Sequence, residues 1–594
     1  MGASKGARMT GDLTGAEIVV QALTDLGVEV VFGYPGGAVL PIYDAIFAQQ
    51  RIRHILVRHE QAAVHAAEGY ARSSGKVGVV LVTSGPGATN AVTGITDALM
   101  DSVPLLVLTG QVPTHLIGTD AFQECDTVGI TRHCSKHNYL VKDTARLGPV
   151  LHEAFYIARS GRPGPVVIDI PKDVQIQRAR YEKPVVIGHK TYKPQLKGDR
   201  ASIEAAVEMI AAAERPIFYT GGGIINSGPV ATQLLRDFAK LTGAPVTSTL
   251  MGLGTMPNEH RQFLGMLGMH GSYEANMAMN RCDLMVCLGA RFDDRVTGRL
   301  DAFSPNSKKI HVDIDRSSLN KTVRVDLGIL GDVGGVLEDM IKIWRARGHK
   351  AADLDQWWAD IAGWRARDSF GFQQKGPELL PQHAIKRLYE LTRDKNPIIS
   401  TEVGQHQMWA AQHFGFHAPN KWLTSGGLGT MGYGLPAAVG VQQAHPDALV
   451  IDIAGDASVL MTMQEMSTAI QYELPIKIFI LNNQHMGMVR QWQQLLHGNR
   501  LSHSYTEALP DFVKLAEAYG CVGIRATKPA ELDDAIKEMI KTPHPVLFDC
   551  RVANLANCFP MIPSGKAHNE MILGEEVADE DVGSVIDAKG KMLV

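Results

Sequence analysis

Two stretches in the last third of the chain decide the fold: Gly455-Asp456-Ala457 and Ile478-Phe479-Ile480-Leu481-Asn482-Asn483. The first follows an apolar run over 448–453, and the second is apolar until its closing amides. A helix-length segment separates them, so the pattern predicts two strands of one sheet joined by a helical crossover. Ligands of open α/β sheets bind beyond the carboxyl ends of the strands, where both polar groups are expected.

Asp456 and Asn483 offer two hard oxygen ligands at that edge. Mg2+ prefers such oxygens and keeps several positions for water and phosphate, so the pair predicts an anchor for a metal-bound diphosphate. His485 follows closely, and its backbone carbonyl is a candidate further ligand. Taken singly, each stretch is better explained by a turn or a strand terminus. Their order, with a strand before each polar group, favours the ligand interpretation.

The rest of the chain predicts an α/β protein of several domains. Its 594 residues exceed what one hydrophobic core spans. Apolar runs alternate with helical segments, as in parallel sheets covered on both faces. The Pro-containing segments 182–197 and 367–382 are expected linkers. They give domains over 12–182, 198–367 and 380–565, followed by an acidic tail over 566–594.

Composition argues against several classes of protein. The net charge of −4 provides no basic surface for nucleic acid. No apolar run is long enough for a membrane helix, and the N-terminal residues lack a signal-peptide core. The seven cysteines are odd in number and scattered, which argues against a disulfide framework or a zinc site. We therefore expect a cytoplasmic protein with reduced thiols.

Three further motifs carry candidate chemistry. Glu60 lies in Val57-Arg58-His59-Glu60-Gln61, at an expected strand-to-helix junction, where a carboxylate also favours the helix macrodipole. The glycine-dense run 425–434 lets backbone approach a ligand, but is equally explained by a tight turn before a buried helix. Thr220-Gly-Gly-Gly223 follows an apolar strand, a weak nucleotide-binding signal because the full G-x-G-x-x-G spacing is absent.

The metal motif and Glu60 together resemble thiamin-diphosphate enzymes, with Ala457 where many relatives have glycine. The charge-rich loop Leu288-Gly-Ala-Arg-Phe-Asp-Asp-Arg-Val-Thr-Gly298 narrows the resemblance to the FAD-containing acetohydroxyacid synthases, also called acetolactate synthases. Further matches extend over nearly the whole chain: Tyr34-Pro-Gly-Gly-Ala38, Gly118-Thr-Asp-Ala-Phe-Gln123, Lys136-His-Asn-Tyr139, Gln484-His-Met-Gly-Met-Val-Arg-Gln-Trp492 and Met561-Ile-Pro-Ser564. The implied fold has three doubly wound parallel-sheet domains: pyrimidine-binding, central FAD-binding and Rossmann-like, and diphosphate-binding.

The resemblance also implies roles for individual residues. Glu60 would share a proton with the aminopyrimidine ring of the cofactor, so that the cofactor's own amino group becomes the base. Gly37 and Gln123 would lie near the reacting centre, and Lys172, Arg295 and Trp492 would line the substrate entrance. Cofactor-binding residues near thiamin diphosphate would be Val403, Gly404, Gln405, His406, Gly429, Met431, Gly455, Ala457 and Met488. The flavin site would use Arg162, Gly222, Thr249, Leu250, Asp313 and Asp332, and Gly268 and His270 are further cofactor-binding candidates.

The implied reaction is decarboxylation of pyruvate on thiamin diphosphate and condensation of the hydroxyethyl group with pyruvate or 2-oxobutyrate, early in valine, leucine and isoleucine biosynthesis. Expected cofactors are thiamin diphosphate, Mg2+ and FAD. Expected partners are a second copy of the chain, with a dimer as the smallest active unit, and a small regulatory subunit. Pyruvate oxidase, glyoxylate carboligase and a catalytically dead relative are the alternatives. Glyoxylate carboligase lacks the glutamate that Glu60 matches.

Overall fold

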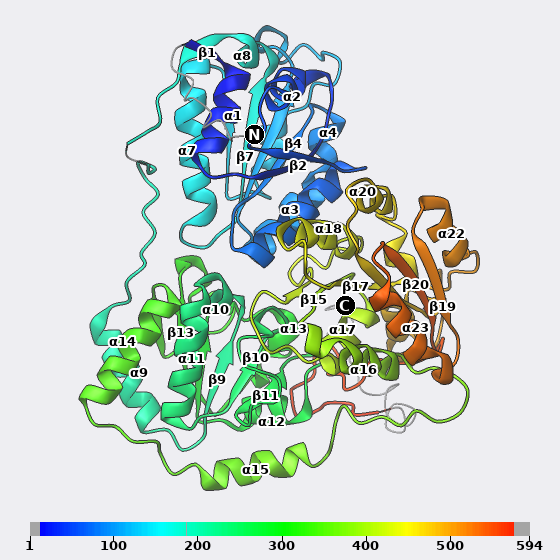
Figure 1. The fold of residues 1–594 in the computed structure, drawn as a ribbon. Helices are drawn as coiled ribbons and strands as arrows, with labels where there is room; N and C mark the ends of the chain where they lie inside the picture. Colours follow the sequence, from blue (N-terminus) through cyan, green and yellow to red (C-terminus); the bar gives the residue numbers. More distant parts are fainter. Residues whose placement is uncertain (1–11, 186, 575–594) are drawn as a thin grey trace, which may run out of the picture. The chain divides into compact units, whose positions relative to one another are not determined.

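The computed structural model describes residues 12–185 and 187–574 and divides the chain into two compact units (Figure 1). Unit 1 comprises 1–193, 425–447 and 462–474, and unit 2 comprises 194–424, 448–461 and 475–594. Three six-stranded parallel sheets confirm the predicted fold class. The domain boundaries 12–182, 198–367 and 380–565 stay predictions. Most of the predicted acidic tail, 575–594, lies outside the described residues.

The sheet of unit 1 has six strands. Its order is β3 (Arg53–Leu56), β2 (Val30–Tyr34), β4 (Gly78–Val82), β5 (Leu105–Gln111), β7 (Pro165–Pro171) and β6 (His137–Leu140). Alternate residues of these strands, such as Val79 and Leu81, belong to a core shared with α1 (Gly15–Asp25) and α7 (Thr144–Arg159). Because alternate residues of a strand point to the same face of the sheet, α1 and α7 cover the face that carries Val79 and Leu81.

The opposite face of this sheet is covered by α3 (Glu60–Ser74), as the contact between the rings of Phe32 and Tyr70 shows. Helix α3 is buried on nearly all sides because α18 (Gly434–Ala444) packs against it. The approach is close: a Cβ on Gly440 would lie 1.8 Å from the carbonyl oxygen of Ala66.

The remaining helices of unit 1 are mostly short. They are α2 (Leu40–Phe47), α4 (Pro86–Asn90), α5 (Val92–Asp101), α6 (Thr127–Thr131), α8 (Lys172–Ile176) and α20 (Glu465–Gln471). A short antiparallel pair, β1 (Asp12–Thr14) with β8 (Arg178–Arg180), joins the two ends of the first 180 residues. Among the described residues of both units, no helix is long and apolar enough to cross a membrane.

Unit 2 holds the other two sheets, which share one large apolar core. The central sheet has the order β11 (Phe263–Met266), β10 (Val246–Ser248), β9 (Pro216–Thr220), β12 (Leu284–Leu288), β13 (Lys308–Asp313), β14 (Leu327–Leu330). The C-terminal sheet has the order β16 (Trp422–Leu423), β15 (Ile398–Thr401), β17 (Val450–Gly455), β18 (Lys477–Asn482), β20 (Val546–Arg551), β19 (Val522–Ala526). Both predicted motif strands, β17 and β18, are thus present and adjacent.

Helices flank both sheets of unit 2 (Figure 1). Around the central sheet they are α9 (Arg200–Ala211), α10 (Gly222–Asn226), α11 (Pro229–Thr242), α12 (Tyr273–Arg281), α13 (Asp294–Thr297), α14 (Val333–Ala346) and α15 (Asp355–Arg365). Around the C-terminal sheet they are α16 (Pro381–Thr392), α17 (Gln405–His413), α19 (Asp456–Val459), α21 (Gly487–Leu496), α22 (Phe512–Tyr519) and α23 (Pro529–Lys541).

Candidate active site

Three predicted ligand-binding loops leave the C-terminal sheet at one edge. Strands β15, β17 and β18 run parallel and side by side, with Gly455 opposite Leu481 in the register. Residues 403–406 follow β15, Asp456 follows β17, and Asn483 follows β18. The expected juxtaposition of the two motif loops at one sheet edge is therefore present, because parallel pairing aligns the carboxyl ends of the strands.

Asp456 is buried and keeps one oxygen without a hydrogen-bond partner among the described residues. Its Oδ1 accepts the N–H of Ala457 at 2.9 Å, while Oδ2 has no partner. Burial raises the pKa of Asp456 to about 7, because the charged carboxylate loses solvation. A buried oxygen left unsatisfied is costly in an empty protein and is what a cation ligand needs.

Hydrogen bonds to two neighbours fix the orientation of the Asn483 side chain. Its Nδ2 donates to Oε1 of Gln405 at 3.2 Å, and its Oδ1 accepts the N–H of His485 at 3.3 Å. Gln405 is fixed in turn, donating to Gln491 at 2.8 Å. Between Asn483 and His485, Gln484 has a φ of +59°, an uncommon backbone conformation for a residue other than glycine. The structure thus ties two of the predicted loops together.

Two glycines at this edge make room for a buried imidazole. A Cβ on Gly404 or on Gly455 would lie 2.7 or 2.8 Å from Cε1 of His406. Burial lowers the pKa of His406 to about 3, so the ring is neutral. Its Nε2 has no partner within the described chain. The glycines are therefore required by close packing as well as by the predicted approach of a ligand.

Unit 1 brings its own predicted residues to the carboxyl edge of its sheet. Gly37 follows β2, Glu60 follows β3, and Lys172 directly follows β7. Gln123 lies in the long segment after β5 with a φ of +60°, and a Cβ on Gly85 would lie 2.7 Å from its carbonyl oxygen. These four candidates share one sheet edge, as ligand-binding residues of α/β proteins do.

Glu60 is the first residue of α3 and is buried. Its Oε2 accepts from Nδ2 of Asn90 at 2.9 Å, and a Cβ on Gly87 would lie 3.6 Å from its Oε1. The turn before Glu60 is anchored at Arg58, whose N–H donates to Glu465 at 2.9 Å. Asn90 and Glu465 could not be predicted as neighbours of Glu60, because neither belongs to a recognisable motif and both are distant in sequence from it.

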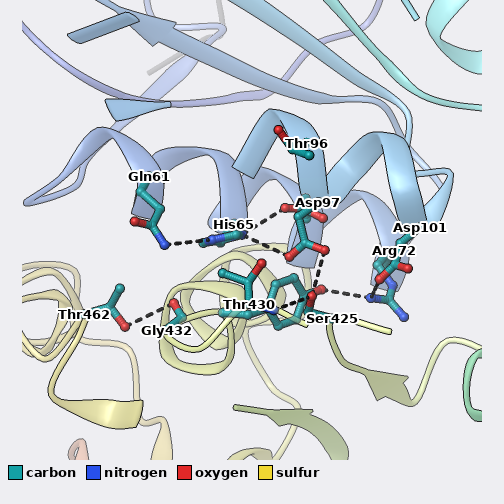
Figure 2. A network of polar contacts seen from close by, with 12 residues as sticks. Gln61, His65, Arg72, Thr96, Asp97, Asp101, Ser425, Thr430, Gly432 and Thr462 are labelled. Atoms are coloured by element: carbon teal, nitrogen blue, oxygen red, sulfur yellow. Dashed lines mark hydrogen bonds and ion pairs between the residues drawn. The ribbon is translucent and has the colours of Figure 1, made fainter. Parts of the chain in front are cut away.

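The glycine-dense loop 425–434 belongs to the same unit as Glu60. Ser425 organises it: its Oγ accepts the N–H groups of Gly429 at 3.0 Å and Thr430 at 2.9 Å. Gly429 has a φ of +77°, which explains glycine at that position. Figure 2 shows this loop against side chains of α3 and α5. The tight turn and the buried helix α18 offered as the structural alternative are both present.

The central sheet gathers most predicted flavin residues at one edge. Gly222 follows β9, Thr249 and Leu250 follow β10, Asp313 closes β13, and Asp332 follows β14. The two further cofactor candidates, Gly268 and His270, follow β11. All six strands of this sheet are parallel, so these positions share its carboxyl edge. The remaining flavin candidate, Arg162, lies in unit 1 and donates to Ser102 at 2.8 Å.

Close backbone approach marks the first turn of this sheet. A Cβ on Gly221 would lie 2.3 Å from the carbonyl oxygen of Gly289, and one on Gly223 would lie 2.7 Å from the Cα of Gly289. Close packing against Gly289 therefore requires glycine at these two positions. His270, with its pKa lowered to about 4 by burial, keeps an Nε2 without a partner in the described residues.

Arg295 and Trp492, both predicted at the substrate entrance, lie together in unit 2. The guanidinium carbon of Arg295 is 6.0 Å from the centroid of the Trp492 ring. Arg295 is largely exposed and 3.7 Å from Asp294, so the guanidinium is available to an anionic ligand. Trp492 and Met488 both belong to α21, which begins shortly after the predicted metal-binding loop.

Known proteins match this chain along most of its length. Residues 13–130, 203–340 and 402–550 match the N-terminal TPP binding, central and C-terminal TPP binding domains of thiamine pyrophosphate enzymes. The chain belongs to the acetolactate synthase family. It is 49% identical to the acetolactate synthase large subunit of Haemophilus influenzae over 567 residues, covering 95% of this chain and 98% of that protein.

Two other relatives align with a similar share of this chain. Identity is 48% with the isozyme 3 large subunit of Escherichia coli, over 95% of this chain and 99% of that protein. It is 46% with the chloroplastic acetolactate synthase of Arabidopsis thaliana, over 94% of this chain and 84% of that protein. The resemblance found in the sequence motifs is therefore confirmed.

Proposed function

We propose that this chain is the catalytic subunit of an acetolactate synthase. It would decarboxylate pyruvate and join the remaining two-carbon unit to pyruvate or 2-oxobutyrate, giving 2-acetolactate or 2-aceto-2-hydroxybutyrate. The observation that carries the proposal is the pairing of Asp456 and Asn483 at adjacent strand ends, in a chain about half identical to acetolactate synthases along nearly its full length. These products would serve valine, leucine and isoleucine biosynthesis.

Mg2+ fits the C-terminal sheet edge. The unpartnered Oδ2 of Asp456 supplies a hard anionic oxygen, and Oδ1 of Asn483 a neutral one. The backbone carbonyl of His485 is the proposed third protein ligand. Few protein ligands suit Mg2+, which retains waters and binds phosphate oxygens in its other positions. The diphosphate would then meet Val403, Gly404, Gln405, His406 and the turn at Gly455 and Ala457.

Thiamin diphosphate would supply the carbanion chemistry that no amino-acid side chain provides. The chain's part is to bind, orient and control a proton. Glu60 would hold a proton at a carboxyl oxygen and share it with the aminopyrimidine ring, while Asn90 fixes the other oxygen at 2.9 Å. Gly429 and Met431 would support the bent form of the cofactor. Gly37 and Gln123 would lie near the reacting carbon.

FAD fits the central sheet. Backbone groups after four of its strands, with Gly222 at the start of α10, offer the carboxyl-edge location where dinucleotides bind parallel sheets. Asp313 and Asp332 would face hydroxyl groups of the flavin nucleotide, because each ends or follows a strand at that edge. Arg162, from the N-terminal third of the chain, is a further proposed flavin-binding residue.

Substrate selection would fall to Arg295 and Trp492, with Lys172 at the entrance. A guanidinium pairs with the carboxylate of the incoming 2-keto acid, and the indole face contacts its alkyl group. Their proximity in unit 2 supports this division of roles.

We further propose a homodimer as the smallest active unit and a separate small regulatory subunit. The name "large subunit" of the Escherichia coli relative supports the second partner. The cytoplasm is the proposed location, supported by the seven free cysteines.

One incubation tests the function against its rivals. The protein is mixed with pyruvate, Mg2+, thiamin diphosphate and FAD, and acetolactate, peroxide and, with glyoxylate present, tartronate semialdehyde are measured. Acetolactate without peroxide is expected. Peroxide would indicate a pyruvate oxidase, and tartronate semialdehyde a glyoxylate carboligase. No product with any substrate would indicate the non-enzymatic relative and overturn the proposal.

A further inference from the structure

Loop 425–434 is fixed by a carboxylate that no motif identifies. Ser425 donates its hydroxyl proton to Oδ1 of Asp97 at 2.8 Å while its oxygen accepts from two loop N–H groups. Asp97 and Ser425 are both fully buried. One carboxyl oxygen of α5 therefore sets the direction of the hydroxyl that shapes the turn (Figure 2).

A second carboxylate, one helical turn later, holds the next residue. Oδ2 of Asp101 accepts the N–H of Gly426 at 2.8 Å, and a Cβ on Gly427 would lie 2.8 Å from its Oδ1. Residues four apart share a helix face, so Asp97 and Asp101 both point toward the loop, as Figure 2 shows. The loop's first two residues are bound by α5, and glycine at 427 lets the backbone come close.

The far end of the loop is held from α3. Arg72 donates to the hydroxyl of Tyr433 at 3.0 Å and lies 4.0 Å from Oδ2 of Asp101. A carboxylate at the last residue of α5 opposes the helix dipole, and the guanidinium offsets that cost. Thr462 adds a hydrogen bond to the carbonyl oxygen of Gly432 at 3.2 Å. Both ends of the loop are therefore tied to neighbouring elements of unit 1.

The charges around Asp97 indicate what the contact requires of it. The titratable groups that act on Asp97 are Glu68, Asp101, His65 and Tyr433, and Arg72 lies beside Asp101. Burial, followed by the nearby Glu68, raises the pKa of Asp97 well above its usual range, and burial lowers the pKa of His65 to about 4. A neutral Asp97 still accepts the hydroxyl proton of Ser425 through its carbonyl oxygen. The contact therefore needs an acceptor at this position and not a negative charge.

We propose that Asp97 and Asp101 are positioning residues: they set the conformation of loop 425–434 and, through Gly429 and Met431, the affinity for thiamin diphosphate. This inference rests on the proposed function. It assigns a role to two carboxylates of the N-terminal third that touch neither substrate nor cofactor. Asp97 acts as a hydrogen-bond acceptor, and Asp101 acts as an anion paired with Arg72.

The test compares three full-length variants, Asp97→Ala, Asp97→Asn and Ser425→Ala, with the wild-type protein. Hydrogen exchange of the Gly429 and Thr430 amides is measured without cofactor, and the Kd for thiamin diphosphate with Mg2+ is measured by tryptophan fluorescence. Thr96→Ala is the matched control, because Thr96 also lies on α5 and its hydroxyl donates to the carbonyl oxygen of Val92 in the same helix. Ser425→Ala is the smaller change and gives the result if Asp97→Ala fails to fold.

Asp97→Ala and Ser425→Ala are expected to accelerate exchange and weaken cofactor binding by about tenfold or more, since each removes one partner of a buried hydrogen bond. Asp97→Asn should restore both values to near wild type. Unchanged exchange in the alanine variants, asparagine behaving as alanine, or altered exchange with unaltered Kd would each overturn the inference. Failure of the wild-type protein to bind thiamin diphosphate would instead overturn the proposed function, and with it the proposed effect of Asp97 on cofactor affinity. The exchange rates of the Gly429 and Thr430 amides would still report whether Asp97 holds the loop.

Discussion

The carboxyl edge of the C-terminal sheet and the buried layer between α3, α5 and α18 use polar groups in opposite ways. At the sheet edge, Asp456 keeps an oxygen without a protein partner among the described residues. In the buried layer, Ser425 uses both its proton and its lone pairs on neighbouring groups. A buried polar atom without a protein partner favours binding of an external ligand. Buried polar groups that bond to one another favour a single conformation.

This difference separates effects on function from effects on stability. A group with an unsatisfied buried oxygen destabilises the empty protein, so its removal should cost binding and leave folding intact. Packing in the α3 and α18 layer contributes to stability, so a change there should lower the melting temperature first. Glu60 begins α3, and its carboxyl group stays a predicted contact of the cofactor.

Glu60→Gln gives the largest expected effect. The amide keeps the shape and the contact with Asn90 but cannot exchange a proton, so kcat should fall about 10²–10⁴-fold. The melting temperature and cofactor affinity should change little. Steady-state acetolactate formation and thermal unfolding measure the two. Glu153→Gln, the same chemical change on α7, is the control and should retain full turnover. Near-normal kcat in Glu60→Gln would remove the glutamate from the mechanism.

Asp456→Asn tests the unsatisfied oxygen directly. Loss of the anionic ligand should weaken Mg2+-dependent binding of thiamin diphosphate by about 100-fold, while the cofactor-free protein unfolds at an unchanged or higher temperature. Titration calorimetry and thermal unfolding measure the two. The exposed Asp447→Asn provides a control of equal chemistry. Wild-type affinity in Asp456→Asn would show that this oxygen binds no metal.

Gly440→Ala perturbs the buried layer without touching a predicted ligand. The new Cβ would lie 1.8 Å from the carbonyl oxygen of Ala66, so α3 and α18 must separate, and unfolding free energy should fall by about 1–3 kcal/mol. Gly363→Ala in α15 is the matched control, since a Cβ there meets nothing within 4 Å. It should be neutral or stabilising, because alanine favours helix. Equal melting temperatures for both variants would contradict the close-packing argument.

The two regions also differ in how far the sequence could predict them. Motif loops such as Asp456 and Asn483 follow strands directly, so parallel topology alone places them together. Contacts such as Asp97 with Ser425 join positions more than 300 residues apart, which no local pattern signals. The burial of α3 on nearly all sides depends on α18, which is distant in sequence and packs against it. Polar residues such as His65 and Glu68 indicate solvent by composition, but here they bond to each other at 2.9 Å.

Trp492→Leu gives the smallest expected effect and tests the rim of the site. Replacing the indole removes the flat face beside Arg295, so preference for 2-oxobutyrate over pyruvate should fall by roughly tenfold, the value of about one methylene contact. Competition between the two acceptors, with both products quantified, measures the ratio. Trp492→Phe retains an aromatic face and should keep most of the preference. A product ratio unchanged in the leucine variant would place acceptor selection elsewhere, whereas loss of total activity with the ratio preserved would make Trp492 a structural support of α21.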